Sequence, residues 1–321
     1  MRILVVRTDK LGDFITALPS MYVLKHQNSQ NKIIALVAPL NKELASTCNF
    51  IDEVIIDNPE NSIYELSQKI KKANMDASVT LFSNTRVALA QFLAGIKLRI
   101  APATKIAQIF YNKRVKQRRS EVKMTEFEYN LELTKALFPT IDTNYEKPLL
   151  HFDDAQSNYR KFCEKNSIKK ELIAFHVGFG GSSDANWNLD EYEILIREVL
   201  HVDKYQVVLT FGPDEIILQE EMQTRLKDTN VVFHLSTDGI VNFAKLISNF
   251  RLFVSTSTGT YHLASLVGTK TMTFFGDSKF ASAARWKSVG DENLQKHYML
   301  PQDEEKREAI FEQVKKELAT F

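Results

Sequence analysis

Short apolar runs alternate with segments of helical spacing along the first half of the chain. The runs are rich in β-branched residues, read RILVV, IIALVA, EVIID and ASVTLF, and begin at Arg2, Ile33, Glu53 and Ala77. Between them, apolar residues recur every three or four positions, as at Ile15, Leu18 and Tyr22. This order predicts βαβ units around a parallel sheet covered on both faces.

The same alternation returns after residue 170. Its runs read LIAFHVG, QVVLTFG, VVFHLS, RLFVST and KTMTFFG, and begin at Leu172, Gln206, Val231, Arg251 and Lys270. The region 138–170 breaks the rhythm and is the predicted linker, with a helix over 154–166. The pattern therefore predicts two doubly wound α/β domains, residues 1–150 and 165–302, that face a central cleft. An amphipathic helix is predicted over 303–321.

Composition narrows the class of protein. A length of 321 residues agrees with two domains of ordinary size. The 41 basic and 40 acidic residues give a net charge of +1, so nothing in the whole-molecule charge favours a nucleic-acid partner. Two distant cysteines favour a reduced, cytoplasmic protein over a disulfide scaffold.

Charged residues and a glycine follow the first apolar run, in RTDKLGDF. Parallel sheets bind ligands beyond the carboxyl ends of their strands, so this turn is a candidate site. Gly12 would let the backbone pass close to a ligand. Asp13 would begin a helix, either as a capping residue or as a general base that deprotonates an attacking hydroxyl. Arg7, Asp9 and Lys10 are interpreted first as solvated loop charges, and Arg7 and Lys10 alternatively as holders of an anion.

Two later turns are rich in small and hydroxyl residues. The first, HVGFGGSSDANW, is typical of an anion-cradling turn, with a plain loop as the alternative; its candidates are Gly178, Gly180, Ser182 and Ser183. His176 is interpreted as a structural histidine. The second, TSTGTYHLASLVG, suits a diphosphate at a helix N-terminus; its candidates are Ser257, Thr258, Gly259, Thr260 and His262. Alternatively, its hydroxyls only cap the helix and His262 belongs to the core.

The run NKRVKQRRSEVK, residues 112–123, is the one strong charge cluster. It is interpreted first as a solvated face, and alternatively as a patch for an anionic partner at the inner face of a membrane. H-E-x-x-H, C-x-x-C and D-x-D motifs do not occur in the sequence, so neither a metal nor another cofactor is predicted.

Together these stretches resemble glycosyltransferase family 9, the heptosyltransferase-like enzymes of bacterial lipopolysaccharide assembly. That family has a strand, a GD turn and an apolar helix ending in LP, as in LGDFITALP here. Its second signature is close to D-T-G-x-x-H-x-A-x-x-x-G before a strand ending in F-G, as in STGTYHLASLVG and TMTFFG. The loop HVGFGG with the later Trp187 is similar to the family's loop after the first strand of the second domain.

The resemblance implies a GT-B architecture of two Rossmann-like domains, with the acceptor mainly on the first and a nucleotide-sugar mainly on the second. It implies inverting, metal-independent transfer of heptose or a related sugar to a lipopolysaccharide, lipooligosaccharide or other surface glycan. Asp13 then matches the general base, and Thr258, Gly259 and His262 match the nucleotide-sugar turn. The resemblance also implies that the helix over 303–321 packs back on the first domain.

Three positions depart from the family's pattern. Ser257 stands where the family has an acidic residue, Ala185 where it has a lysine, and Lys270 where it has a proline. The departures leave open a different donor sugar, or a non-catalytic member that binds nucleotide or glycan or scaffolds other transferases. They also leave open a substitute cation, for which the candidates are Lys10, Lys279 and Arg285.

Overall fold

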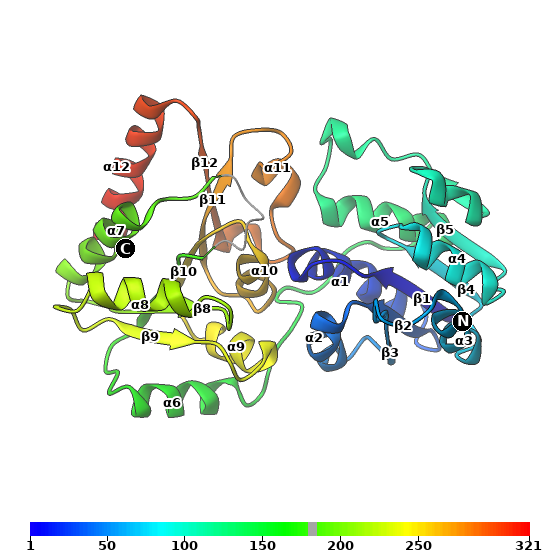
Figure 1. Ribbon diagram of the computed structural model, residues 1–321, viewed down its shortest axis with the longest axis horizontal. Coiled ribbons are helices and arrows are strands. Elements are labelled where there is room, and N and C mark those ends of the chain that lie inside the picture. Colours follow the sequence, from blue (N-terminus) through cyan, green and yellow to red (C-terminus); the bar gives the residue numbers. More distant parts are fainter. Residues whose placement is uncertain (179–184) are drawn as a thin grey trace. The chain divides into compact units, whose positions relative to one another are not determined.

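The computed structural model describes residues 1–178 and 185–321 and divides into two compact units, Met1–Glu146 and Lys147–Phe321 (Figure 1). The boundary lies within the region 138–170. The helix α6 (Ala155–Lys165) belongs to the second unit, where it packs against α9 (Ile240–Ile247). The second unit therefore begins before residue 165.

The first unit is an α/β fold around a six-stranded parallel sheet in the order β3-β2-β1-β4-β5-β6. Its elements are β1 (Arg2–Arg7), α1 (Leu11–His26), β2 (Lys32–Val37), η1 (Pro39–Asn41), α2 (Lys42–Thr47), β3 (Glu53–Ile56), α3 (Ile63–Lys72), β4 (Ala77–Thr80), α4 (Thr85–Leu93), β5 (Leu98–Pro102), η2 (Ile106–Phe110), β6 (Lys113–Val115), η3 (Arg119–Glu121) and α5 (Glu126–Leu137).

The second unit repeats this architecture in the order β12-β11-β10-β7-β8-β9. Its further elements are β7 (Leu172–His176), α7 (Leu189–His201), β8 (Gln206–Phe211), α8 (Ile216–Arg225), β9 (Val232–Leu235), β10 (Leu252–Thr256), α10 (Gly259–Leu266), β11 (Thr271–Gly276), α11 (Ala283–Trp286), η4 (Glu292–Leu294), β12 (Gln295–Leu300) and α12 (Glu304–Thr320). Read from the other edge, this order is the one found in the first unit.

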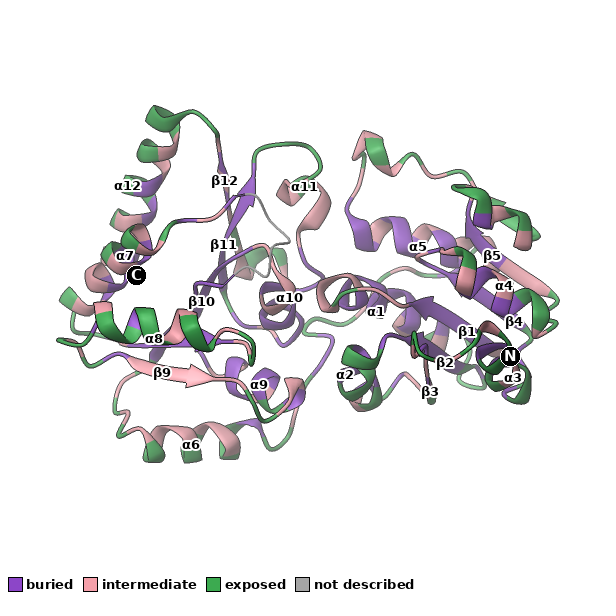
Figure 2. Ribbon diagram, viewed as in Figure 1, coloured by how far each residue is buried: buried purple, intermediate pink, exposed green. Residues whose placement is uncertain are grey.

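Burial explains which strands the apolar pattern reveals. Every residue of β1 and β2 except the first is buried, because helices cover both faces of the sheet (Figure 2). The edge strands β6 and β12 carry exposed and half-buried residues and do not form apolar runs. The sequence pattern therefore missed them, and it missed β5 as well.

In each sheet the strand order reverses once, between β1 and β4 and between β7 and β10. Ligands of doubly wound sheets bind at such switch points, beyond the carboxyl ends of the strands. The turns after β1 and β10, which carry the predicted sites, lie at these two places.

The prediction that residues 303–321 pack back on the first domain is wrong. Phe311, Val314 and Leu318 of α12 are buried in the core of the second unit, and α12 lies along α7 (Figure 1). The Phe311 ring lies 5.2 Å from that of Trp187. The apolar stripe of the helix thus finds its burial within its own unit.

In the part of the chain that the structure describes, no helix is both long and apolar enough to cross a membrane.

Candidate active site

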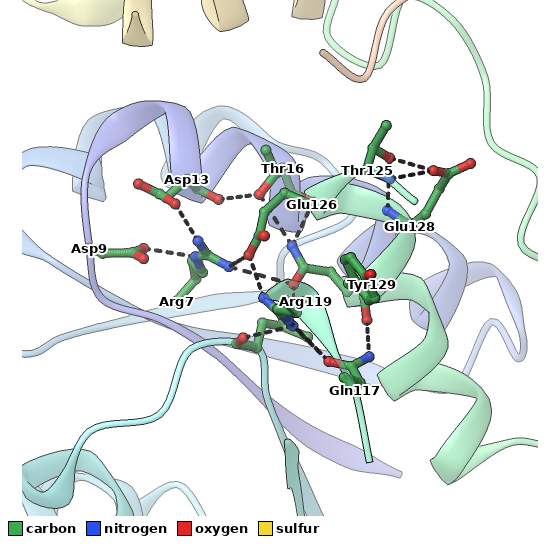
Figure 3. Close-up of polar contacts among 12 residues, drawn as sticks. Arg7, Asp9, Asp13, Thr16, Gln117, Arg119, Thr125, Glu126, Glu128 and Tyr129 are labelled. Atoms are coloured by element: carbon green, nitrogen blue, oxygen red, sulfur yellow. Dashed lines mark hydrogen bonds and ion pairs between the residues drawn. The ribbon is translucent and has the colours of Figure 1, made fainter. Parts of the chain in front are cut away.

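A cluster of charged side chains surrounds Arg7 at the carboxyl end of β1 (Figure 3). Arg7 is 1% exposed. Its Nε donates to Asp9 Oδ1 (2.8 Å), its Nη1 to Glu126 Oε1 (3.2 Å) and its Nη2 to Asp13 Oδ1. The interpretation of Arg7 as a solvated loop charge is therefore wrong: one buried guanidinium joins two carboxylates that follow β1 to a third on α5.

A second arginine completes the cluster. Arg119 Nη1 donates to Glu126 Oε1, and its Nη2 donates to Asn130 Oδ1 at 3.3 Å. Asn130 Nδ2 in turn donates to the carbonyl oxygen of Thr16 on α1 at 3.1 Å. Arg119 lies in the basic run 112–123, but it is half-buried and holds α5 to the rest of the unit. The interpretation of that run as a solvated face is wrong at this residue.

Burial and charge act against each other in this cluster. Burial by itself lowers the pKa of Arg7, but the charges of Asp9, Asp13 and Glu126 raise it above its ordinary value, so Arg7 stays charged. Burial raises the pKa of Asp9 to about 6, with the Arg7 charge opposing and the Asp13 charge adding to the rise. The cluster thus contains three carboxylates and two arginines that donate hydrogen bonds to them.

Asp13 is the third residue of α1, and Gly12 is the second. The N-cap residue of α1 is Lys10, which is exposed. The Lys10 side chain makes no capping hydrogen bond with any residue in the described range 1–178. The interpretation of Asp13 as the capping residue is wrong. One oxygen of its carboxylate accepts from Arg7, and the other turns away from the guanidinium (Figure 3). The Asp13 side chain is 22% exposed.

The two predicted turns of the second unit follow neighbouring strands. Ser255 of β10 lies opposite His176 of β7, so the residues after each strand share one edge of the sheet. Gly178 and the residues 257–260 lie there. The candidates Gly180, Ser182 and Ser183 fall outside the described residues.

The turn after β10 leads directly into α10. Ser257 N donates to the carbonyl oxygen of Phe274 (2.9 Å), and Gly259 is the first helical residue. Thr258 is the N-cap residue, but its hydroxyl contacts that of Thr260 at 2.9 Å instead of capping the helix. Helix N-termini leave backbone N–H groups without helical partners, and these attract anions.

The structure places His262 in the core of the second unit, as the alternative interpretation supposed. Its side chain is 4% exposed, and Nδ1 lies 3.1 Å from Ser288 Oγ. Burial, followed by the charge of His297, lowers the pKa of His262 to about 3. The imidazole is therefore neutral at physiological pH.

A hollow of about 710 Å³ lies beside Gly178; its lining includes Trp187, Gly212, Pro213, Glu215 and Leu218. Glu215 accepts from Gly212 N (2.7 Å) and lies 3.8 Å from Nε2 of the buried His176. Burial lowers the pKa of His176, with the Glu215 charge opposing. A Cβ at position 178 would lie 1.9 Å from Glu215 Oε1. Glu215 was missed by sequence reasoning, although FGPDE follows a predicted strand.

Two of the residues that depart from the family's pattern, Ala185 and Lys270, make contacts within the second unit. Ala185 is buried, and its carbonyl oxygen accepts from Thr256 Oγ1 at 2.8 Å. Lys270 precedes β11, and its Nζ lies 4.4 Å from the centre of the Phe321 ring. Trp187 packs against Phe274 in the core (5.4 Å between ring centres).

The three candidate substitute cations lie in different places. Lys279 and Arg285 follow β11, whose Phe274 lies opposite Thr256, so both come after the carboxyl end of a strand next to β10. Lys10 belongs to the first unit. Among the described residues, no group of three or more His, Cys, Asp or Glu side chains could hold a metal ion.

Comparison with known proteins shows the family of the chain. Residues 63–314 match the family model described as glycosyltransferase family 9 (heptosyltransferase). The "Putative glycosyltransferase" of Haemophilus influenzae is 38% identical over 302 residues, which cover 90% of this chain and 86% of the relative. Lipooligosaccharide heptosyltransferase 2 of Campylobacter jejuni is 24% identical over 300 residues, which cover 90% and 85%.

The fold has solved counterparts. The Escherichia coli ADP-heptose LPS heptosyltransferase II superposes with a TM-score of 0.80 at 18% identity, covering 100% of this chain and 99% of that one. The predicted α/β fold, with two Rossmann-like parallel sheets of the GT-B type, is confirmed. On the family model and the 38% identity, the chain belongs to glycosyltransferase family 9 and is a heptosyltransferase-like glycosyltransferase.

Proposed function

We propose that the chain transfers heptose or a related sugar from a nucleotide-sugar to a lipopolysaccharide, lipooligosaccharide or other surface glycan, with inversion and without a metal. Relatives named heptosyltransferases support the sugar and the acceptor class. The observation that carries the proposal is the Asp13 carboxylate. It lies at the switch point of the first sheet, held by a buried arginine and not used as a helix cap.

Asp13 acts as the general base in this proposal. The oxygen that faces away from Arg7 takes the proton of an acceptor hydroxyl while the hydroxyl oxygen attacks the anomeric carbon of the donor. The bond from that carbon to the diphosphate breaks, and the nucleoside diphosphate leaves with the bonding electrons. Arg7 orients the carboxylate by its bond to the other oxygen.

The second unit binds the donor in this proposal. The first-turn N–H groups of α10 and the hydroxyls of Thr258 and Thr260 receive the diphosphate, whose growing charge they stabilise in place of a metal. Lys279 supplies the positive charge that the family's lysine would give at position 185, where this chain has alanine. The hollow beside Gly178 has the size of a small-molecule site and takes the nucleoside.

The proposed partners are this donor and a glycan or glycolipid acceptor, with no nucleic acid. The proposed location is the cytoplasm, at the inner face of the membrane where glycolipid acceptors are assembled. Neither a metal nor another cofactor is required.

The first experiment identifies the donor. The purified protein is melted with ADP-, GDP-, UDP- and CMP-sugars, because a ligand that binds the folded state raises the melting temperature. Binding that persists in a chelator supports metal independence. A protein that binds a donor but neither transfers nor hydrolyses it would be the non-catalytic alternative.

The second experiment tests the base. Asp13→Asn keeps the size and one oxygen for Arg7 but cannot take a proton. We expect single-turnover transfer to fall by about 10²-fold to 10⁴-fold, with circular dichroism unchanged. The exposed Asp142→Asn of the same unit is the matched control and should transfer normally. Near-normal transfer by Asp13→Asn would remove Asp13 from the mechanism.

A further inference from the structure

Positive charge is concentrated in one segment of the first unit. Residues 77–120 contain nine Lys or Arg and no Asp or Glu, although the whole chain has 41 basic and 40 acidic residues. A chain that is nearly neutral as a whole thus carries a segment with cations alone. Such a distribution marks an anionic partner for that part of the surface.

Most of these cations are available to a partner. Arg86 and Arg119 pair with Asp57 and Glu126 and hold the fold together. Five exposed side chains on or beside β5, η2 and β6 form no ion pair with any residue that the structure describes; they are Lys97, Lys105, Lys113, Arg114 and Lys116. β6 is the edge strand of its sheet, so its cations have no further strand beside them.

Exposed apolar side chains lie among the same elements. Phe92 and Leu93 end α4 and are 50% and 48% exposed, and Ile106 and Ile109 of η2 are 78% and 67% exposed. These are four of the twelve large apolar side chains that stand out as exposed among the described residues. Isolated exposed apolar residues are ordinary, but a group of four on adjoining elements marks an interaction surface.

Contacts join the elements that carry the two kinds of side chain. The helix α4 packs against η2, with the rings of Phe92 and Phe110 5.8 Å apart. Arg99 Cζ lies 5.4 Å from the centre of the Phe92 ring, and Arg99 Nε donates to the carbonyl oxygen of Phe110 (2.7 Å). Lys105 directly precedes Ile106 at the start of η2. Cations and apolar side chains therefore lie on adjoining elements.

We propose that this surface, the four exposed apolar residues with the five unpaired cations, docks on an anionic phospholipid bilayer. A bilayer offers diffuse negative charge above an apolar interior, which is the chemistry that these side chains complement. The inference rests on the proposed function, because a glycolipid acceptor is itself embedded in a bilayer. An acidic protein would match the cations but would leave the large apolar side chains without a reason.

The test is sedimentation of the full chain with vesicles, without donor or acceptor. Binding to mixed phosphatidylglycerol and phosphatidylcholine should exceed binding to phosphatidylcholine alone. It should weaken as salt rises from about 0.1 M to 1 M, because the screening length shortens from ~10 Å to ~3 Å. Lys105→Gln/Lys113→Gln/Lys116→Gln should lower the partition coefficient by about 10²-fold, at about 5-fold for each cation.

The apolar contribution has its own variant. Ile106→Ser/Ile109→Ser should lower partitioning by about tenfold or more, since neither side chain could then bury in the interface. Matched controls come from the second unit. Ile216→Ser/Ile217→Ser removes side chains that are 50% and 81% exposed, and Lys169→Gln/Lys227→Gln/Lys316→Gln removes three exposed lysines. Both controls should bind vesicles as the unaltered protein does.

Equal binding by all variants, or equal binding to both kinds of vesicle, would overturn the proposal. So would a serine variant that binds normally, because the surface would then be purely electrostatic. Transfer assayed with a water-soluble acceptor separates the two ideas. A protein that binds vesicles but transfers no sugar contradicts the proposed function alone, and one that transfers sugar but ignores vesicles contradicts this inference alone.

Discussion

The guanidinium of Arg7 touches three carboxylates: Asp9 in the turn after β1, Asp13 in the first turn of α1, and Glu126 on α5, more than a hundred residues later. Removing one partner from a buried ion cluster leaves the others uncompensated. Glu126 contacts Arg7 and Arg119, and through Arg7 it is linked to Asp13, so in the proposed mechanism it is a positioning residue for Asp13.

Glu126→Gln tests this role. The variant keeps the shape and one acceptor oxygen but removes a negative charge, so more of the Arg7 charge acts on the other two carboxylates. We expect kcat to fall by about tenfold or more, because misplacement of a reacting group is costly, and the acidic limb of the pH–rate profile to move to lower pH. A purely structural role would lower stability without moving that limb.

The matched control for this prediction is Glu132→Gln, on the same helix but 42% exposed. Its pH–rate profile should be that of the unaltered protein. Glu126→Asp should recover part of the lost rate, because it restores the charge at a slightly different reach. If Glu126→Gln left kcat unchanged and the acidic limb where it was, Glu126 of α5 would have no part in the reaction.

The raised pKa of Asp9 predicts how the stability of the protein changes with pH. Its pKa is raised from 3.8 to about 6 in the folded state, so the folded protein binds this proton more readily than the unfolded chain does. The favourable contribution is present below pH 4 and is lost as pH rises through 6. Asp9→Asn imitates the protonated form at every pH.

We therefore expect the free energy of unfolding of Asp9→Asn to rise relative to that of the unaltered protein as pH goes from 4 to 7. The relative rise should reach up to about 3 kcal/mol. Urea titrations at each pH measure the difference. Curves that run parallel across this range would show that Asp9 ionises in the cluster without cost.

The turns after β7 and β8 depend on one another through Glu215. Its carboxylate accepts from Gly212 N and fills the space that a side chain at position 178 would need. The residue at position 178, beside the proposed nucleoside hollow, is thus restricted by a side chain of the next βα unit. This coupling belongs to the packing of elements and cannot be read from either loop alone.

Gly178→Ala should lower the free energy of unfolding by about 1–3 kcal/mol, because Glu215 must move and give up its bond to Gly212. Gly212→Ala is the control, since its Cβ would lie 3.5 Å from Glu215 Oε2, an ordinary contact. Adding Glu215→Ala to Gly178→Ala should cost less than the sum of the single changes. Additive costs would show that the two sites do not interact.

We expect the second unit to lose stability in acid because it holds buried histidines. Six of the seven histidines follow residue 146, as do both tryptophans, Trp187 and Trp286, so intrinsic fluorescence reports the second unit. His262 and His297 have pKa values lowered to about 3 and about 4, and burial is the first cause of each. The unfolded chain therefore binds these protons more readily, and stability falls as pH drops below 6.5.

We expect the fluorescence-detected urea midpoint to fall between pH 7 and pH 5, with up to about 2 kcal/mol of the loss from His262. His262→Gln should be less stable at pH 7 but lose less on acidification, and the exposed His201→Gln should behave as the unaltered protein does. A midpoint that is constant over this range would contradict the buried, neutral state of His262.

The sequence by itself determined the local features of this protein. Central strands are buried on both faces, so their apolar runs are enough to indicate two α/β units. The LGDF and STGTYHLASLVG stretches are recognisable because the residues of each motif are close together in the chain, directly after a strand. The family then follows from two short motifs in order.

Only the tertiary structure decided what these residues touch. Arg7 has the pattern of a loop charge, and its burial is accounted for by its partner Glu126, 119 positions away. The amphipathic stripe of α12 specified that the helix packs but not on which unit. The edge strands β6 and β12 lacked an apolar signal because they carry exposed and half-buried polar residues, whereas the other two edge strands, β3 and β9, have apolar runs. Periodicity records which face of an element is buried, whereas pairing between distant residues depends on which surfaces the folded chain brings together.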